Sequence, residues 1–184
     1  MSQRGRGAVS GDVAVDLRDY IRDIPDFPKP GIVFRDLTPL LLDARALRAA
    51  VEAVAEPFRG QSIDCVVGIE SRGFIVGTPV ALALGTGFAL IRKQGKLPYE
   101  TLQARYDLEY GTDQIEMHVD ALQPGQRVLV VDDLIATGGT ATAAVELARK
   151  AGAEIAGCAF LIELEELGGR ARLGVETVHS VIVY

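Results

Sequence analysis

Cysteine is scarce in this chain of 184 residues, and so are long apolar runs and positive charge. The two cysteines, Cys65 and Cys158, each lie inside an apolar run, so we expect buried reduced thiols and no disulfide. No stretch of about 18 apolar residues lacks a charged residue or a glycine, so we expect no membrane span. No apolar segment follows the basic residues near the start of the chain, so we expect no signal peptide and a cytoplasmic protein.

Acidic residues outnumber basic ones by 25 to 19, and the formal net charge is -6 at pH 7. Nucleic-acid phosphates repel such a chain at long range, which disfavours a general nucleic-acid binder but leaves room for a local basic site for a small anion. Apolar residues make up 48% and charged residues 24%, as in globular proteins. We expect a single domain over residues 1–184, with about 12 frayed residues at its start.

Apolar runs and helix-like periodicities alternate along the sequence. Strands are expected at residues 65–69, 88–91, 127–131, 155–162 and 175–183, and helices at residues 13–23, 44–56, 74–84 and 138–150. This alternation predicts an α/β fold whose parallel sheet is flanked by helices on both faces. Asp43 is the expected N-cap of the second helix, and Gly152 the stop of the fourth.

The segment at about residues 92–118 differs from its surroundings. It is polar, and it carries Gly95, Pro98 and Gly111. Weak alternation over residues 106–117 favours a hairpin after a long loop. Long irregular insertions in compact domains are more often lids than filler, so we predict a lid loop and hairpin that project from the core.

The strongest functional signal is VLVVDDLIATGGT at residues 128–140. An apolar strand leads into two acids, a loop of small residues and the start of a helix, and ligands of open α/β sheets bind at such strand ends. Glycine N–H groups, threonine hydroxyls and a helix N-terminus together suit a terminal phosphate. The candidate phosphate-binding residues are Ala136, Thr137, Gly138, Gly139 and Thr140.

Asp132 and Asp133 stand just before this loop, and their carboxylates can accept hydrogen bonds from vicinal hydroxyls. A phosphate group beside vicinal hydroxyls describes a ribose 5-phosphate. No lysine follows the glycines, and the spacing is neither that of a Walker loop nor Gly-x-Gly-x-x-Gly. The alternative is that the two acids cap a turn and that the glycines serve its geometry.

The same string resembles the phosphoribosyl-pyrophosphate binding motif of the type I phosphoribosyltransferases. Four further segments look like the adenine-specific members of that family: FPKPGIVFRD (27–36), GIESRGF (68–74), IRKQGKLP (91–98) and YDLEYG (106–111). The resemblance runs from about residue 13 to the C-terminus. It implies a parallel five-strand core sheet flanked by helices, with a small hood made from the N-terminal segment and C-terminal strand material, and an active site between hood and core.

The resemblance also implies the reaction. The 5-phosphoribosyl group would pass from 5-phosphoribosyl 1-pyrophosphate to adenine, giving AMP and pyrophosphate in purine salvage. Mg²⁺ is implied as the cofactor, carried by the substrate with no direct protein ligand, and the expected assembly is a homodimer without nucleic-acid or membrane partners. Catalysis would come mainly from fixed charges placed where charge develops.

Ser71 and Arg72 match the pyrophosphate loop of the family, which carries a non-proline cis peptide, expected here near Glu70 and Ser71. The Arg72 guanidinium suits phosphate oxygens; the alternative is a surface salt bridge. Three cations after the next predicted strand are further candidates for the pyrophosphate, although a solvated loop would also explain them: Arg92, Lys93 and Lys96. By resemblance, Arg92 reaches the site of the neighbouring subunit.

Val33, Phe34 and Arg35 match the adenine site of the family. Phe34 would stack on the purine, or else belong to the core, and Leu161 would cover the other ring face. Backbone groups of Val33 and Arg35 would read the exocyclic amine and a ring nitrogen, which disfavours a 6-oxo base.

Glu109 matches the acid that the family is proposed to use for proton exchange with adenine N7, and Tyr110 would close over the site. By composition alone Glu109 is an exposed hairpin acid.

Two other functions stay open: the same transfer to a 6-oxopurine, and a sensor of phosphoribosyl pyrophosphate, which would need a nucleic-acid-binding domain or a basic face. We expect His118 and His179 to be structural and three acids to form a solvated face: Glu163, Glu165 and Glu166.

Overall fold

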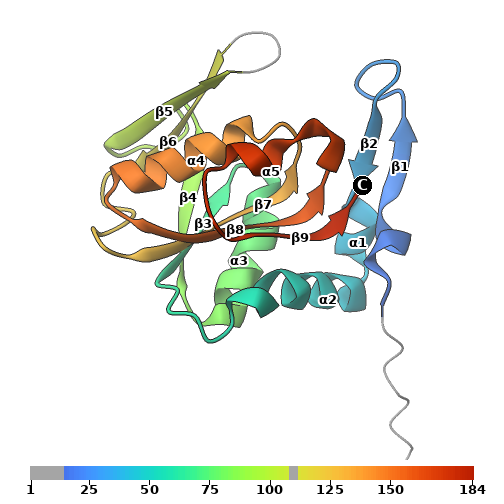
Figure 1. Ribbon diagram of the computed structural model, residues 1–184, viewed down its shortest axis with the longest axis horizontal. Coiled ribbons are helices and arrows are strands. Elements are labelled where there is room, and N and C mark those ends of the chain that lie inside the picture. The colour runs from blue at the N-terminus through green and yellow to red at the C-terminus, as the bar shows by residue number, and fades with distance from the viewer. Residues whose placement is uncertain (1–14, 108–111) are drawn as a thin grey trace, which may run out of the picture. The chain divides into compact units, whose positions relative to one another are not determined.

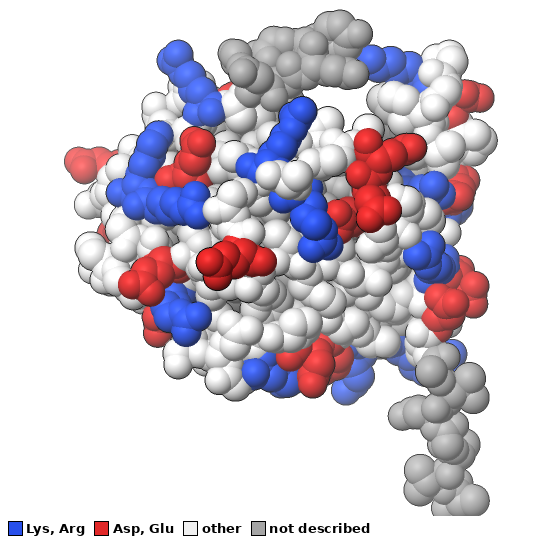
Figure 2. Space-filling model, viewed as in Figure 1, with Lys and Arg blue, Asp and Glu red and all other residues white. Residues whose placement is uncertain are grey.

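The structure, a computed structural model, describes residues 15–107 and 112–184 (Figure 1). The chain divides into two compact units, one up to Leu47 and the other from Arg48 to Tyr184. Within the described residues, no helix is both long and apolar enough to cross a membrane. On the face drawn in Figure 2, acidic and basic side chains are interspersed.

The N-terminal unit is built on a two-stranded antiparallel sheet. Its elements are η1 (Leu17–Tyr20), β1 (Arg22–Pro25), β2 (Val33–Asp36) and α1 (Thr38–Leu42). The helix predicted over residues 13–23 is therefore wrong in its described part, which holds one 3-10 turn followed by a strand. The reason is pairing: residues of β1 face those of β2, with Ile24 opposite Phe34, and this ladder overrides the local helical pattern.

The second unit contains one seven-stranded sheet in the order β5-β6-β4-β3-β7-β8-β9. Its strands are β3 (Cys65–Ile69), β4 (Gly87–Lys93), β5 (Thr101–Asp107), β6 (Thr112–His118), β7 (Arg127–Ile135), β8 (Glu154–Glu163) and β9 (Val178–Val183). The five strands from β4 to β9 in this order are parallel, and β6 runs antiparallel to both β4 and β5. The predicted five-strand parallel core is confirmed, and the β5–β6 hairpin extends it to seven strands.

Two strand assignments differ from the sequence analysis. β7 continues past the two acids to Ile135, because its pairing with β8 continues as well, with Asp132 opposite Phe160 and Leu134 opposite Ile162. β9 pairs with β8 in the main sheet. The prediction that C-terminal strand material joins the N-terminal segment in a hood is therefore wrong, since the small sheet contains only β1 and β2.

The remaining helices are α2 (Ala44–Ala55), η2 (Glu56–Phe58), α3 (Arg72–Leu84), α4 (Gly139–Lys150), η3 (Glu165–Leu167) and α5 (Gly169–Arg172). Asp43 caps α2 as predicted, since its Oδ1 accepts from the backbone nitrogens of Arg45 at 2.8 Å and Ala46 at 3.0 Å. The core cluster on one face of the sheet contains alanines, Val145 and Leu147 of α4. α3 lies on the opposite face, where a side chain at Gly77 would meet Val131 of β7.

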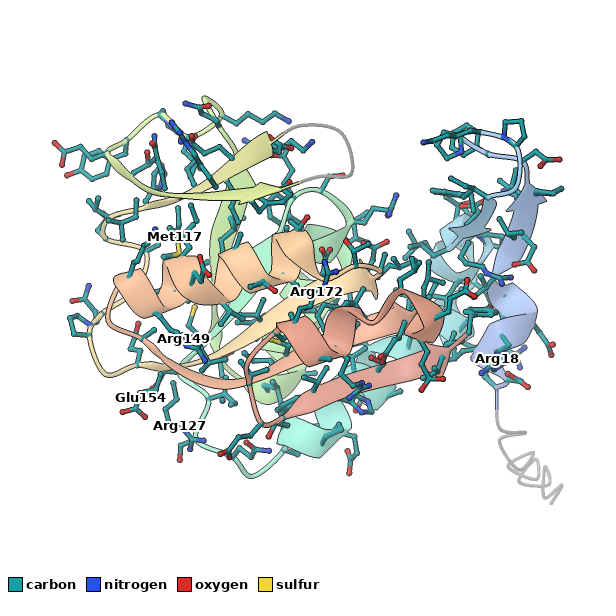
Figure 3. All side chains as sticks on the ribbon, turned by 45° about the horizontal axis from the view of Figure 1, so that its top comes forward. Arg18, Met117, Arg127, Arg149, Glu154 and Arg172 are labelled. Carbon is teal, nitrogen blue, oxygen red and sulfur yellow. The ribbon has the colours of Figure 1, made fainter. Side chains whose placement is uncertain are left out.

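The hairpin differs from the expected projecting lid. Ala104 and Ile115 are 2% exposed, Met117 is fully buried, and all three belong to the core cluster with α4. Met117 is labelled in Figure 3. The prediction that this insertion projects from the core is therefore wrong for the base of the hairpin. The two cysteines are free and buried, as predicted.

Candidate functional site

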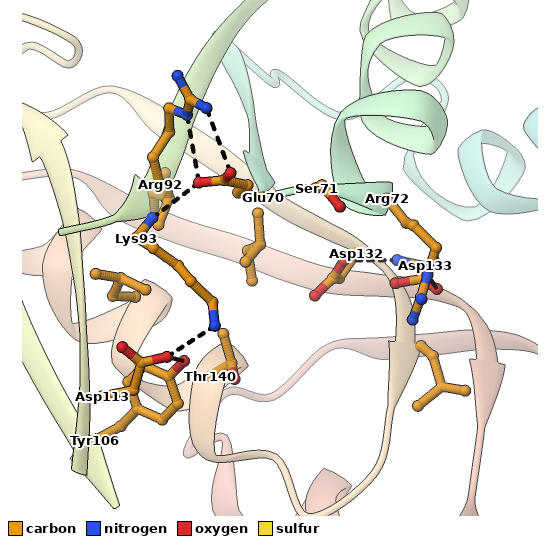
Figure 4. A pocket seen from close by; sticks show the side chains of 14 residues that line it. Glu70, Ser71, Arg72, Arg92, Lys93, Tyr106, Asp113, Asp132, Asp133 and Thr140 are labelled. Carbon is orange, nitrogen blue, oxygen red and sulfur yellow. Dashed lines mark hydrogen bonds and ion pairs between the residues drawn. The ribbon is translucent and has the colours of Figure 1, made fainter. Parts of the chain in front are cut away.

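A cavity of about 460 Å³ opens at the carboxyl ends of β3, β4 and β7, where neighbouring parallel strands all deliver their end residues (Figure 4). Its volume is within the range of small-molecule sites. The lining residues are Ile69, Glu70, Ser71, Arg72, Ile91, Arg92, Lys93, Tyr106, Asp113, Ile115, Asp132, Asp133, Leu134 and Thr140.

A second cavity of about 120 Å³ adjoins the first, and the two share Asp132, Leu134 and Thr140. The rest of its lining comes from the end of β7, the loop that follows and the first turn of α4: Ile135, Ala136, Thr137, Gly138, Gly139 and Ala141. Gly138 is the N-cap of α4 and has a φ of 81°, a left-handed conformation that glycine adopts readily. The predicted phosphate residues and Asp132 therefore line one hollow.

The two acids of β7 lie in different surroundings. Asp133 is 5% exposed, and its Oδ2 accepts from Nε of Arg72 at 2.5 Å. Burial raises the pKa of Asp132, and the neighbouring Asp133 carboxylate raises it further. Arg72, predicted to bind pyrophosphate, thus compensates one acid of the predicted ribose site.

Glu70 binds the side chains of two predicted cations and the backbone of the third. Its carboxylate accepts from Arg92 at 3.3 Å, from Lys96 Nζ at 2.5 Å and from the backbone nitrogen of Lys93 at 3.0 Å. Burial would raise the pKa of Glu70, but the hydrogen bonds from Lys96, Arg92 and Lys93 outweigh burial and lower the pKa to about 2. Glu70 is therefore charged at neutral pH and holds the side chains of Arg92, which lines the cavity, and of Lys96, which does not.

The hairpin adds a further acid, Asp113, to the cavity. Lys93 Nζ lies 3.0 Å from Oδ2 of Asp113 on β6, and Tyr106 Oη on β5 donates to the same oxygen at 3.1 Å. The Lys93 hydrogen bond lowers the pKa of Asp113, and burial raises the pKa of Tyr106. Three strands are therefore joined by one polar cluster beside Thr140 (Figure 4).

The first turn of α3 approaches β7 too closely for a side chain. A Cβ at Gly73 would lie 2.7 Å from Oδ1 of Asp132 and 3.0 Å from the carbonyl oxygen of Val131. The preceding peptide bond between Glu70 and Ser71 is cis, as the family resemblance predicts.

Among the described residues, Lys96 and the predicted adenine-binding residues do not line these two cavities. Val33, Phe34 and Arg35 form β2 of the N-terminal unit, where the rings of Phe34 and Phe27 meet edge to face at 5.3 Å. Leu161 is 1% exposed within β8. Glu109 and Tyr110 lie outside the described residues.

Sequence reasoning missed three polar residues of the larger cavity: Glu70 as a side chain, Tyr106 and Asp113. The motif around Glu70 and the alternation in the hairpin were visible, but the cations that pair with Glu70 and Asp113 come from other segments of the chain, and Tyr106 meets Asp113 only through the pairing of β5 with β6. It also misplaced Glu163, which was predicted on a solvated face; this carboxylate is 4% exposed and pairs with Arg170. Glu165 and Glu166 are exposed as predicted.

Comparisons with known proteins agree with this geometry. The family model described as "Phosphoribosyl transferase domain" matches residues 41–181. An adenine phosphoribosyltransferase of Rhodopirellula baltica is 58% identical over 170 residues, covering 92% of this chain and 82% of that protein. The crystal structure of adenine phosphoribosyltransferase from Rhodothermus marinus is 57% identical, with a TM-score of 0.87, covering 91% of this chain and 96% of that chain.

A more distant enzyme was crystallised with ligands. The adenine phosphoribosyltransferase of Saccharomyces cerevisiae, complexed with adenine and an imino-altritol 1,6-bisphosphate, is 40% identical with a TM-score of 0.85. The similarity covers 90% of this chain and 96% of that chain.

Proposed function

The chain belongs to the phosphoribosyl transferase family, among its adenine phosphoribosyltransferases, and from this premise we propose how its residues carry out the transfer. The enzyme joins adenine to 5-phosphoribosyl 1-pyrophosphate and releases AMP and pyrophosphate, a reaction of purine salvage. As the bond from C1′ to pyrophosphate breaks, positive charge grows on the ribose and negative charge on the leaving group. Residues that hold fixed charges near both groups would therefore lower the barrier.

The small cavity takes the 5-phosphate. Backbone N–H groups of residues 137–140 and the hydroxyls of Thr137 and Thr140 donate to its oxygens. Asp132, which lines both cavities, accepts from a ribose hydroxyl. Such a hydrogen bond stabilises the charged carboxylate and offsets the burial that raises its pKa.

The larger cavity takes the pyrophosphate. Arg72, Arg92, Lys93 and Lys96 supply its positive charge, and Ser71 contributes its backbone. Their present partners are the carboxylates of Glu70, Asp113 and Asp133, so an incoming pyrophosphate must compete with acids for each cation. In the proposed dimer, Arg92 would instead serve the pyrophosphate of the neighbouring subunit, as the family resemblance implies.

Adenine recognition is proposed for the N-terminal unit and β8. Phe34 stacks on the purine, which is worth about 1 to 3 kcal/mol for a base on an aromatic ring. The backbone of Val33 and Arg35 reads the exocyclic amine and a ring nitrogen, and Leu161 covers the second ring face. From the hairpin, Glu109 exchanges a proton with N7 while Tyr110 closes the site.

Mg²⁺ is proposed to enter with the substrate. Within residues 15–107 and 112–184, no three His, Cys, Asp or Glu side chains form a group that could hold a metal ion. Mg²⁺ commonly keeps several waters and is bound by one or two carboxylates together with substrate phosphates, and Asp132 fits such a contact through water. When bound, the ion neutralises charge on the departing pyrophosphate.

The assembly is proposed to be a homodimer in the cytoplasm. Large apolar side chains stand exposed on the second unit: Ile75 at 47% and Leu82 at 76% on α3, and Leu90 at 40% on β4. Apolar surface of this kind is what a second copy of the chain would cover. The two free thiols suit a reducing compartment.

The observation that carries the proposal is the meeting of a cationic cavity with a glycine-rich loop at Asp132. The test is a steady-state assay with phosphoribosyl pyrophosphate, Mg²⁺ and each of adenine, hypoxanthine, guanine and xanthine. It is run on the wild type, on Asp132→Asn/Asp133→Asn, and on Glu165→Gln/Glu166→Gln, which removes an exposed pair of adjacent acids.

We expect the wild type to turn over adenine and none of the other three bases. Adenine turnover should be lost in Asp132→Asn/Asp133→Asn and kept in Glu165→Gln/Glu166→Gln. Turnover of a 6-oxopurine would overturn the account of Val33 to Arg35. Saturable binding of phosphoribosyl pyrophosphate without turnover of any base would favour a sensor.

A further inference from the structure

The phosphate loop rests on a second glycine segment that lies about 30 residues further along the chain, at the start of α5. Gly169 is buried, and a Cβ there would collide with the carbonyl oxygen of Ala136 and lie 2.8 Å from the backbone nitrogen of Gly138. Conversely, a Cβ at Gly138 would lie 2.6 Å from the carbonyl oxygen of Gly169. The two backbones are therefore in direct contact, and any shift of α5 would move the loop.

The next residue, Arg170, fixes α5 to the sheet. Its Nε and Nη2 donate to the two oxygens of Glu163 at 3.0 and 2.5 Å, and its Nη1 donates to the carbonyl oxygen of Val178 at 2.6 Å. Nη2 also lies 3.3 Å from Oγ of Ser180. A bidentate pair between a guanidinium and a carboxylate fixes orientation as well as distance.

Glu163 makes this attachment rigid. It ends β8 and is 4% exposed, although its neighbours along the chain, Glu165 and Glu166, are exposed. A carboxylate with so little access to water is stable only when it is paired and hydrogen-bonded. The Arg170 hydrogen bonds lower the pKa of Glu163, so the pair stays charged at neutral pH.

We infer that Arg170 and Glu163 are positioning residues for the 5-phosphate: they hold Gly169 against the loop, and so fix the backbone N–H groups at residues 137–140. Backbone donors bind an anion tightly only when their directions are set before the ligand arrives. The inference rests on the proposed function, because it names residues that hold the loop assigned there to the 5-phosphate. Neither residue lines the two cavities, so both act through the loop.

The test compares Arg170→Met with Arg172→Met. Arg172 is on the same short helix and is labelled in Figure 3; within the described part of the chain its guanidinium has no hydrogen bond or ion pair, so the control removes equal charge near the loop. Binding of ribose 5-phosphate and of pyrophosphate is measured by calorimetry, together with the KM for each substrate.

For Arg170→Met we expect ribose 5-phosphate to bind about 10- to 100-fold more weakly, as for a site displaced by a fraction of an ångström to an ångström. Pyrophosphate binding and the KM for adenine should stay within about twofold, as should all values for Arg172→Met. Arg170→Lys keeps the positive charge but cannot form the bidentate pair with Glu163, so it should rescue little of the affinity for ribose 5-phosphate.

Because Arg170→Met leaves a buried carboxylate unpaired, the double variant Glu163→Gln/Arg170→Met is included. It should regain thermal stability without regaining affinity for ribose 5-phosphate. The inference would be overturned if Arg170→Met bound ribose 5-phosphate as tightly as the wild type, or if Arg170→Met and Arg172→Met lost affinity equally. It would also be overturned if the wild type did not bind ribose 5-phosphate. A wild type that binds ribose 5-phosphate but does not turn over adenine would contradict only the proposed function.

Discussion

Arg72 donates from Nε to Oδ2 of Asp133 at 2.5 Å, and this ion pair joins the first residue of α3 to the acidic pair of β7. Asp133 is nearly inaccessible to water, whereas the Arg72 side chain is 46% exposed on the cavity side. One guanidinium thus compensates a buried carboxylate and still faces the proposed pyrophosphate.

This pair predicts that Arg72→Met loses both folding stability and kcat/KM, and that the two losses can be separated. The unpaired Asp133 should lower the free energy of unfolding by about 1.5 to 3 kcal/mol, the usual value of a hydrogen bond to a charged group. Adding Asp133→Asn should restore stability, measured by urea unfolding, but not kcat/KM. Recovery of activity in the double variant would contradict a role of Arg72 in substrate binding.

Asp113→Ala should improve the affinity for phosphoribosyl pyrophosphate. Lys93 now lies 3.0 Å from Asp113, and the substrate must displace that acid. A partly exposed pair contributes about 0.2 to 1 kcal/mol, so the KM should fall by up to about fivefold. Asp120→Asn, an exposed acid outside the cavities, is the control in the same assay. An increased KM in Asp113→Ala would show that Asp113 assists binding.

Glu70 should make stability depend on acid pH. Its pKa is lowered from 4.5 to about 2 in the folded protein, so its contribution is full above about pH 4.5 and is lost as the pH falls to about 2. The difference in unfolding free energy between wild type and Glu70→Gln should therefore shrink across this window. A difference that stays constant from pH 5 to 2 would rule out this carboxylate as the cause.

Gly73→Ala tests the close approach of α3 to β7. The added methyl group would lie 2.7 Å from Oδ1 of Asp132, and such overpacking costs about 1 to 3 kcal/mol. Adenine turnover should fall as well, because Asp132 must move. Gly87→Ala adds the same group where nothing lies within 4 Å, so its denaturation midpoint and activity should remain normal.

The thiols should be inert in the folded protein. Burial raises the pKa of Cys158 to about 12 and also raises that of Cys65, so neither forms much thiolate at neutral pH. A thiol-specific reagent should label two groups only after denaturation. Rapid labelling of the native protein would show that one site opens.

Local patterns in the sequence predicted most of the sheet. The five apolar residues of β3 are all buried, and Asp43 caps α2, because both features depend on neighbours in the chain. The helix expected before residue 23 failed because β1 finds its partner ten residues later in β2. The periodicity of apolar residues describes one segment by itself and carries no information about the strand that pairs with it.

In the site, too, features carried by consecutive residues could be predicted, and pairs between distant residues could not. The loop at residues 136–140 could be predicted because its chemistry lies in consecutive residues. The pairs of Arg72 with Asp133, 61 residues apart, and of Arg92 with Glu70, 22 residues apart, depend on strand order and were not predicted. Glu163 was misplaced for a different reason: its partner Arg170 is only 7 residues away, but Glu163 belongs to an acidic run whose other members, Glu165 and Glu166, are exposed.

The order of the parallel strands has a consequence for synthesis of the chain. β3 lies between β4 and β7, and Cys65 pairs with Val128, so the central strand lacks one neighbour until the second half of the chain is made. On the ribosome, neither cavity can form before residue 140 has emerged and β7 has paired with β3. Substrate therefore cannot assist the early steps of folding, and it can stabilise only a chain that has already assembled its sheet.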